Sequence, residues 1–327
     1  MKYVFIGPNS QATQVLFRDL FELDNVIYVE YPINIKKSYF CQKIIKVLFR
    51  TEFIMHGLVS GGIVKFFCSK ELLKVANENK ESVFIYFYPW ISTVVDSGIM
   101  HKIKNISNNI IHVAMFYDIQ IMNRHNLDSI KRNYDIVATY DENEACKANV
   151  SYIAPIYSRT KRMMSTDLEQ YDLSFVGKAK DRYDLLIAIY DFLEKNNVTC
   201  HFFILGVPKA KRKKRAGIEY GDREISSDEA DLYIESSRCI LDLVPYGTDA
   251  LTSRHREAVI YGKKLLSNNR HILSDKYYNT DMMQYFSQVE KIDITFFNGK
   301  NTNYNYNGDY CATNFIKDLE ALIKEKK

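Results

Sequence analysis

Residues 238–268 hold the side chains best suited to binding an anionic ligand. An apolar run, Cys239–Val244, is short enough for a buried strand, and the loop Pro245–Ser253 after it contains a glycine, hydroxyls and a carboxylate. Arg254 and Glu257 follow in the first turns of a helical pattern. Because ligands of parallel α/β sheets bind where strand ends meet helix N-termini, this stretch predicts a binding site.

The elements around this loop have the order of a parallel α/β unit. Helical periodicity covers Ser253–Tyr261, with Gly262 just past the expected end, and a second strand-like run covers Lys264–Ser267. Strand, loop, helix and strand in this order form a βαβ unit. An ordinary βαβ unit with a solvated Arg254–Glu257 pair is the alternative that these residue types leave open.

The same stretch resembles the donor-binding segment of GT-B-type glycosyltransferases, in particular those of bacterial lipopolysaccharide and capsular polysaccharide biosynthesis. Those proteins carry a strand followed by a pattern close to G-x-x-x-L-T-x-R-x-x-E-A-x-x-x-G-K-K-L. The matching residues here are Gly247, Leu251, Thr252, Arg254, Glu257, Ala258, Gly262, Lys263, Lys264 and Leu265.

The resemblance implies how a nucleotide-sugar donor is held. Glu257 would bind the ribose hydroxyls, and Leu251 and Thr252 would supply backbone donors to the diphosphate. Many retaining members have the pattern Glu-x7-Glu, and Asp249 stands here in place of its first Glu. Whether transfer retains or inverts the anomeric configuration therefore stays open.

A second part of the expected donor site lies where the second half of the chain begins. The run Leu173–Val176 reads as a strand, and the sequence DLSFVGKAKDRYDLL around it resembles the first strand and turn of the C-terminal half in the same family. Gly177 would let the backbone approach a ligand, and Lys178 or Arg182 would meet phosphate, with a solvated loop lysine as the alternative. The donor-binding candidates are Gly177, Lys178, Arg182, Tyr246, Gly247, Asp249, Leu251, Thr252, Arg254 and Glu257.

The best acid/base cluster of the first half follows the apolar run Ile110–Phe116. Asp118 stands just after this expected strand, and Arg124 and His125 come shortly afterwards. We expect Asp118 to be the catalytic base, with His125 in reserve. A charge arrangement at the start of a helix is the alternative for the same residues.

Chain length and strand–helix alternation predict two α/β domains. The chain has 327 residues, more than one core usually supports, and the alternation predicts parallel sheets. With the resemblance, the expected fold class is α/β, with two Rossmann-like domains of the GT-B fold facing across a cleft. We expect an N-terminal Rossmann-like acceptor-binding domain at 1–155, a linker at 156–171, a C-terminal Rossmann-like nucleotide-sugar-binding domain at 172–311, and a C-terminal helix at 312–327 that crosses back to the first domain. Ile292–Phe297 is expected to be a strand.

Two basic segments raise the question of a membrane surface. Residues 209–215 form the densest charge run, which fits a solvated loop, a contact with donor phosphate or anionic lipid, or a nucleic-acid patch. No aromatic residue interrupts the run, and the net charge is only +4, so we expect no nucleic-acid partner. Ser38–Phe49 is an amphipathic helical pattern that fits either a membrane surface or a helix packed on a sheet.

Composition and cysteine usage indicate the compartment. The six cysteines stand singly, none in C-x-x-C, which favours reduced cysteines over a zinc site. No apolar run reaches the length of a membrane span, and the first residues read as a strand that ends at Gly7 rather than as a signal peptide. We therefore expect a cytoplasmic protein with peripheral contact to the inner face of the cytoplasmic membrane as an open alternative.

These patterns, with the resemblance, predict a glycosyltransferase of the hexosyl or a related class. It would move a sugar from a nucleotide-sugar donor to a glycan or lipid-linked glycan acceptor of the cell surface. The sequence contains no D-x-D, the motif of metal-dependent transferases, so we expect no metal and no cofactor besides the donor. A non-catalytic glycan- or partner-binding protein of the same shape and a nucleotide-sugar isomerase remain as alternatives.

Overall fold

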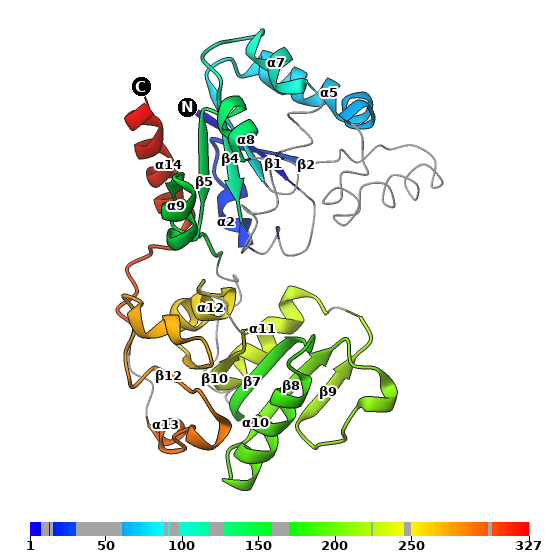
Figure 1. Cartoon of the computed structure of the whole chain (residues 1–327), viewed down its shortest axis with the longest axis vertical. Coiled ribbons are helices and arrows are strands. Elements are labelled where there is room, and N and C mark those ends of the chain that lie inside the picture. Colours follow the sequence, from blue (N-terminus) through cyan, green and yellow to red (C-terminus); the bar gives the residue numbers. More distant parts are fainter. Residues whose placement is uncertain are drawn as a thin grey trace. The chain divides into compact units, whose positions relative to one another are not determined.

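The computed structural model describes residues 1–7, 13, 16–30, 61–87, 91, 98–117, 127–158, 170–223, 225–244, 250–299 and 303–326. The chain divides into two compact units (Figure 1). The N-terminal unit comprises Met1–Ser158 with Tyr310–Lys327, and the C-terminal unit comprises Arg159–Asp309. Most of the expected linker, at 156–171, lies outside the described residues.

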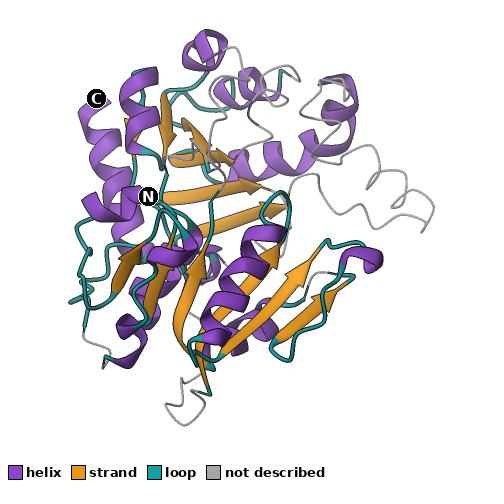
Figure 2. Ribbon diagram, turned by 60° about the horizontal axis from the view of Figure 1, so that its bottom comes forward, coloured by secondary structure: helices purple, strands orange, loops and turns teal. Residues whose placement is uncertain are grey.

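Each unit contains its own six-stranded sheet, in which all neighbouring strands are parallel. Figure 2 shows these strands with helices packed around them. Parallel strands need crossover connections, and helices supply them in both units. The predicted α/β class with two Rossmann-like domains is therefore confirmed.

The sheet of the N-terminal unit has the order β2-β1-β3-β4-β5-β6. Its strands are β1 (Lys2–Gly7), β2 (Val26–Glu30), β3 (Ser82–Phe87), β4 (Ile111–Phe116), β5 (Ile136–Thr139) and β6 (Ser151–Tyr152). Its helices are α2 (Arg18–Phe21), α5 (Gly61–Glu78), α7 (Ile99–Lys104), α8 (Leu127–Asn133), α9 (Glu142–Ala148) and α14 (Ala312–Lys326). The central strands are apolar on both faces because helices cover both faces.

The last helix of the chain packs into the core of the N-terminal unit. Phe315 and Leu319 of α14 are buried in the same cluster as Tyr3 and Phe5 of β1. The rings of Phe315 and Phe5 have centroids 6.2 Å apart, and Tyr3 donates a hydrogen bond of 2.6 Å to Glu320. The chain therefore returns to the N-terminal unit after completing the C-terminal unit, and its last helix packs against β1.

His112 lies on the opposite face of the N-terminal sheet, inside β4. Its side chain is fully buried, and its Nδ1 lies 3.0 Å from the Tyr86 hydroxyl. Burial disfavours the charged imidazolium and, with Lys104 acting in the same direction and Asp135 against it, lowers the pKa of His112 to about 4. His112 is thus a neutral core residue.

We expect this histidine to make the N-terminal unit sensitive to mild acid. Its pKa is lower in the folded than in the unfolded chain, so unfolding takes up a proton, and stability is lost as the pH falls from about 6.5 towards 4. Between pH 7 and pH 5 the loss attributable to His112 should be about 2 kcal/mol. Urea unfolding of the wild type and of His112→Gln at both pH values measures it, and an equal pH dependence in both proteins would contradict the prediction.

The sheet of the C-terminal unit has the order β12-β11-β10-β7-β8-β9. Its strands are β7 (Tyr171–Lys178), β8 (Cys200–Leu205), β9 (Ile218–Gly221), β10 (Ser237–Asp242), β11 (Lys264–Ser267) and β12 (Met283–Tyr285). Its helices are α10 (Tyr183–Lys195), η3 (Lys209–Lys211), α11 (Ser227–Glu235), α12 (Ser253–Tyr261), η4 (Arg270–Ser274), η5 (Val289–Lys291) and α13 (Thr295–Asn298).

The helix α12 and the strand β11 have the predicted bounds. Gly262 adopts a φ of 64°, which is the left-handed conformation that ends many helices and that glycine takes without strain. Farther along, the predicted strand at Ile292–Phe297 is wrong. Asp293 accepts hydrogen bonds from the Thr295 amide and hydroxyl, at 2.9 and 2.7 Å, which form a local turn, and the short helix α13 follows it instead of a strand.

Candidate functional site

The order of strands in the C-terminal unit creates a switch point beside β7. From β7 the chain adds β8 and β9 on one side, and then it returns to add β10, β11 and β12 on the other. Connections therefore leave the carboxyl ends of β7 and β10 in opposite directions. Ligands of open α/β sheets bind at such a point, so this edge is the candidate site.

Side-chain hydrogen bonds hold the N-terminus of α12 at the carboxyl end of β10. Thr252 caps the helix by accepting a hydrogen bond of 3.3 Å from the His255 amide, and its hydroxyl donates to Asp242 at 2.9 Å. Ser267 of β11 donates to the other oxygen of Asp242, also at 2.9 Å. Amides of the first helical turn have no intrahelical acceptor, so this arrangement aims them at the carboxyl edge of the sheet.

Asp242, which is not among the residues predicted from the sequence, is the centre of this arrangement. It stood inside the apolar run Cys239–Val244, where nothing marked it as a partner of the helix cap. Its side chain is buried, and burial raises the pKa of its carboxyl despite the hydrogen bonds from Ser267 and Thr252. Its two hydrogen bonds join the N-terminus of α12 to β10 and β11.

Two adjacent asparagines hold the ends of the loop between β10 and α12. The Asn268 side chain accepts from the Val244 amide at 2.8 Å and donates to the Val244 carbonyl at 3.1 Å. Asn269 donates to the Ala250 carbonyl at 2.9 Å. The segment 245–249 between these anchors lies outside the described residues. Neither asparagine is among the site residues predicted from the sequence.

Arg254 connects α12 to β7 at the switch point. Its guanidinium donates to the Val176 carbonyl of β7 at 2.7 Å and forms an ion pair with Glu257. The side chain of Glu257 is 6% exposed and that of Arg254 is 25% exposed. The structure therefore brings Glu257 next to the carboxyl end of β7 and pairs it with Arg254.

Arg182 makes a second bridge between β7 and β10. It stands at the N-cap position of α10 and donates to the Lys178 carbonyl at 3.0 Å and to the Leu243 carbonyl. Lys178 is exposed at the end of β7. Gly177 precedes it, and a Cβ there would approach the Phe175 ring to 3.2 Å, so packing also favours glycine. The described donor-site candidates thus converge on one edge of the sheet.

A pocket of about 530 Å³ adjoins this edge at the N-terminus of α10. The loops after β7 and β8 line it, and three lysines and two aspartates stand around it. Tyr183 of α10 donates to the Lys211 carbonyl and accepts from the Lys213 amide, each at 2.9 Å, which fixes the basic segment against the helix. Its charged lining residues are Lys180, Lys211, Lys213, Asp181 and Asp184.

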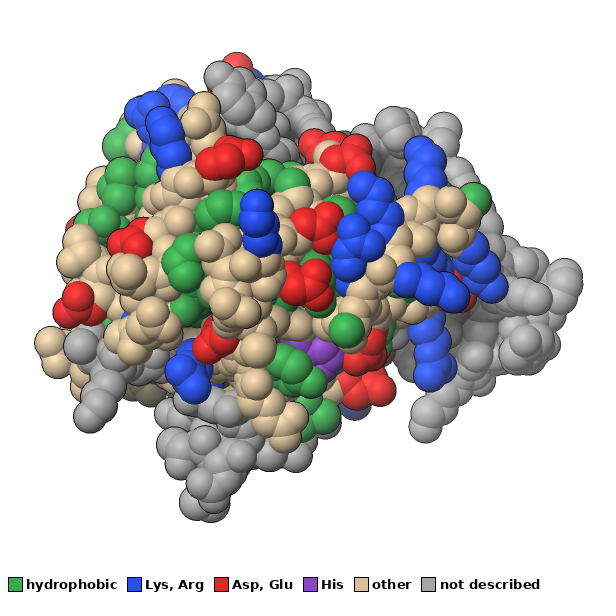
Figure 3. All heavy atoms as spheres, turned by 90° about the horizontal axis from the view of Figure 1, so that it is seen from below, with side chains coloured by type: hydrophobic (Ala, Val, Ile, Leu, Met, Phe, Trp, Pro, Cys, Tyr) green, Lys and Arg blue, Asp and Glu red, His purple; other side chains and the backbone are tan. Residues whose placement is uncertain are grey.

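The basic run 209–215 is thus folded onto its own unit. Arg212 pairs with Asp222, and Arg215 donates to Asp191 at 2.6 Å. Figure 3 shows the molecule from below, with a group of Lys and Arg side chains at the right. The β8–β9 connection lies on the same side in Figure 1. Both arginines form ion pairs within the C-terminal unit, whereas Lys211 and Lys213 line the pocket next to the candidate site.

Five predicted site residues lie outside the described residues: Asp118, His125, Tyr246, Gly247 and Asp249. The amphipathic segment Ser38–Phe49 and Arg124 do so as well. Among the helices that the structure describes, none combines the length and apolar character needed to cross a membrane.

Comparison with known proteins gives no relative by sequence, since neither a family model nor a curated protein matches. Solved structures match over almost the whole chain. The structure of Anabaena HepE in complex with UDP and glucose has a TM-score of 0.53 at 9% identity, covering 100% of this chain and 95% of that one. UDP-GlcNAc 2-epimerase from Neisseria meningitidis bound to UDP-GlcNAc has a TM-score of 0.52 at 11% identity, covering 99% and 100%. The chain therefore has the two-domain α/β fold of the GT-B glycosyltransferases.

Proposed function

We propose that this protein is a glycosyltransferase that moves a sugar from a nucleotide-sugar donor to a surface-glycan acceptor. The observation that carries the proposal is the convergence of Glu257, the N-terminus of α12 and the segment Gly177–Arg182 at the switch point of the C-terminal sheet. A nucleoside diphosphate needs hydrogen-bond acceptors for its ribose and donors for its phosphates, and this edge offers both.

In this proposal each part of the site has one task. Glu257 accepts hydrogen bonds from the ribose hydroxyls, and Arg254 holds its carboxylate in place. The first amides of α12 and Lys178 stabilise the diphosphate as the bond between the anomeric carbon and the phosphate oxygen breaks. The acceptor hydroxyl then forms the new bond to the anomeric carbon, while a base takes its proton.

The acceptor that we propose is a glycan or lipid-linked glycan of lipopolysaccharide or capsule biosynthesis. This part rests on the likeness of residues 247–265 to the donor-binding segment of those transferases. We further propose that the protein acts in the cytoplasm, with peripheral contact to anionic lipid at the inner face of the cytoplasmic membrane. Exposed lysines beside the site, such as Lys209, fit such a contact.

A nucleotide-sugar isomerase is the second candidate, because the chain shares its fold with a UDP-GlcNAc 2-epimerase over 99% of its length. The two functions differ in what they need. An isomerase converts the nucleotide-sugar without any acceptor, whereas a transferase releases the nucleoside diphosphate only as it moves the sugar. Product analysis of UDP- and GDP-sugars incubated with and without glycan acceptors separates them.

Binding of nucleotides is the first test of the proposal. A ligand present at a hundred times its dissociation constant stabilises the native state by about 2.7 kcal/mol, which a thermal-shift screen detects. We expect UDP, GDP or one of their sugars to raise the melting temperature, and the free sugars alone to leave it unchanged. If no nucleoside diphosphate or nucleotide-sugar shifts the transition, the protein does not bind a donor and the proposal is wrong.

We expect transfer to be independent of a divalent metal. The sequence lacks D-x-D, and the proposed site meets the diphosphate with Lys178 and helix amides instead. Initial rates measured with excess EDTA should equal those of the untreated enzyme. A loss of activity that Mn²⁺ or Mg²⁺ restores would show that a metal neutralises the leaving group.

A further inference from the structure

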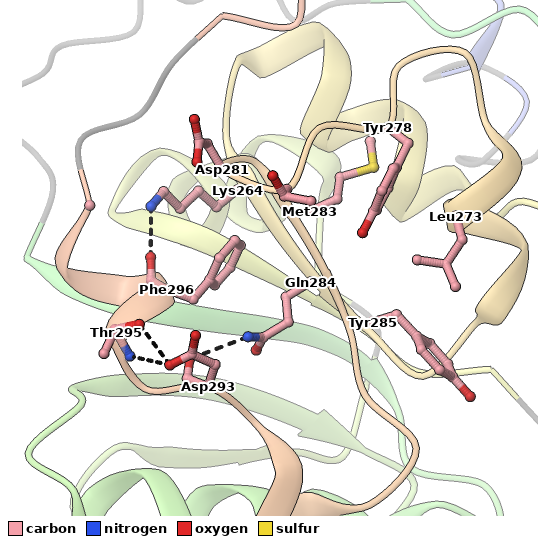
Figure 4. Close-up of a pocket in the computed structure, with 12 residues that line it drawn as sticks. Lys264, Leu273, Tyr278, Asp281, Met283, Gln284, Tyr285, Asp293, Thr295 and Phe296 are labelled. Carbon is pink, nitrogen blue, oxygen red and sulfur yellow. Dashed lines mark hydrogen bonds between the residues drawn. The ribbon is translucent and has the colours of Figure 1, made fainter.

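A second pocket of the C-terminal unit lies away from the switch point (Figure 4). Its volume is about 700 Å³, within the range of sites that take small molecules. Residues of β11, of the edge strand β12 and of α13 line it. Lys264 is the first residue of β11, whereas the candidate donor site lies at the carboxyl ends of the strands. The pocket extends along β12 as far as Tyr285, and none of its lining residues belongs to the candidate donor site.

The pocket contains a buried ammonium group with hydrogen-bonding capacity to spare. Lys264 is 3% exposed, and its Nζ donates to the Phe296 carbonyl at 2.6 Å and lies 4.8 Å from the centre of the Phe296 ring. An ammonium has three N–H donors, and the described residues supply one acceptor. A Cβ at Gly299 would lie 3.1 Å from this nitrogen, so glycine at that position leaves room beside it.

A buried acceptor faces the same region. The side-chain amide nitrogen of Gln284 donates to the Asp293 carbonyl at 3.3 Å, while its Oε1 is buried without a hydrogen-bond partner among the described residues. An unsatisfied buried acceptor destabilises the folded chain, because it has lost its hydrogen bonds to water without replacing them. A ligand that donates a hydrogen bond to Gln284 and accepts one from Lys264 would satisfy both groups.

Apolar surface completes the pocket. Figure 4 shows Lys264, Gln284 and Asp293 on one side, with Tyr278, Leu273 and Tyr285 on the other. The two tyrosines are partly exposed, and Leu273 is 46% exposed although it is apolar. A matching ligand has both hydroxyl groups and a C–H face.

The charges of the lining select among polar ligands. One lysine stands among two exposed aspartates, Asp281 and Asp293, so the lining has no excess of positive charge that would favour a phosphate or a carboxylate. Neutral sugars carry hydroxyls that donate and accept, and they pack a C–H face on aromatic rings. We propose that this pocket is a second, non-catalytic site that binds one neutral sugar unit of a glycan. It stands independently of the donor site, and no bond is made or broken in it.

Saturation-transfer NMR with neutral sugars tests the site on the full chain. The probes are methyl glucoside, methyl galactoside, N-acetylglucosamine and maltotriose, each recorded in the presence of excess UDP to separate this site from the donor site. We expect at least one probe to receive saturation from the wild type. Gln284→Leu and Tyr285→Ala should each weaken its binding by roughly tenfold, the effect of one lost hydrogen bond or ring contact.

The control is Gln288→Leu, the same change at an exposed glutamine outside the pocket. It should bind the probe like the wild type. Absence of saturation transfer for all four probes overturns the inference, and so does unchanged binding in both Gln284→Leu and Tyr285→Ala. Circular dichroism shows whether each variant is folded. UDP binding is measured on the same samples, so failure of the donor-site proposal is seen separately from failure of this one.

Discussion

Replacing Glu257 by alanine is expected to weaken binding of UDP or GDP by about 1–3 kcal/mol, or roughly 5- to 150-fold. This is the cost of losing hydrogen bonds between the ribose and a charged acceptor. The carboxylate is almost fully buried and held by Arg254 in a fixed position, so little freedom is lost when the ribose binds. Isothermal titration calorimetry of wild type and variant measures the difference.

Arg254→Ala distinguishes two roles of the arginine. If Arg254 acts on the diphosphate, the variant loses more affinity for UDP than for uridine. If it acts by positioning Glu257, as its contacts with Glu257 and the Val176 carbonyl indicate, affinity for both falls by the same factor. The matched control is Lys195→Ala, which removes an exposed cation in the last turn of α10, away from the candidate site. Binding at wild-type strength in both site variants would place the donor elsewhere.

The features of the site that the sequence predicted are those encoded by neighbouring residues. The helix α12 has local start and stop signals, since Thr252 caps it and Gly262 ends it. Its register on the chain also sets Arg254 and Glu257 one helical turn apart, which lets them pair. These relations span few residues, and the bounds of the helix were predicted correctly.

The features that the sequence did not reveal depend on distant partners. Asp242 accepts a hydrogen bond from Ser267, which is 25 residues further along the chain. Asn268 accepts one from the amide of Val244, which is 24 residues earlier in the chain. An apolar run with one carboxylate gives no sign of either contact. The edge strand β12 was missed because its three residues pair only with β11, and no local pattern specifies that pairing.

The largest expected effect on activity belongs to Asp118→Asn. If transfer inverts the anomeric carbon, a base must take the acceptor proton, and general-base catalysis contributes about 10²–10⁴-fold. Asp118 itself lies outside the described residues, but β4 ends at Phe116, so the sequence carries Asp118 just past the carboxyl end of a buried strand. Turnover with saturating donor and acceptor should fall by about 10²–10⁴-fold, while UDP affinity stays close to that of the wild type.

Four measurements decide whether Asp118 is the base. Asp128→Asn, the same change at an exposed residue in the first turn of α8, is the matched control and should leave turnover unaltered. A rate that rises with pH at roughly 6–7 would instead favour His125, since an unperturbed imidazole titrates there. Near-wild-type turnover of Asp118→Asn removes Asp118 from the mechanism. A retaining enzyme needs no base of this kind. The anomeric configuration of the product therefore shows whether transfer is inverting, which is the case that these tests of Asp118 assume.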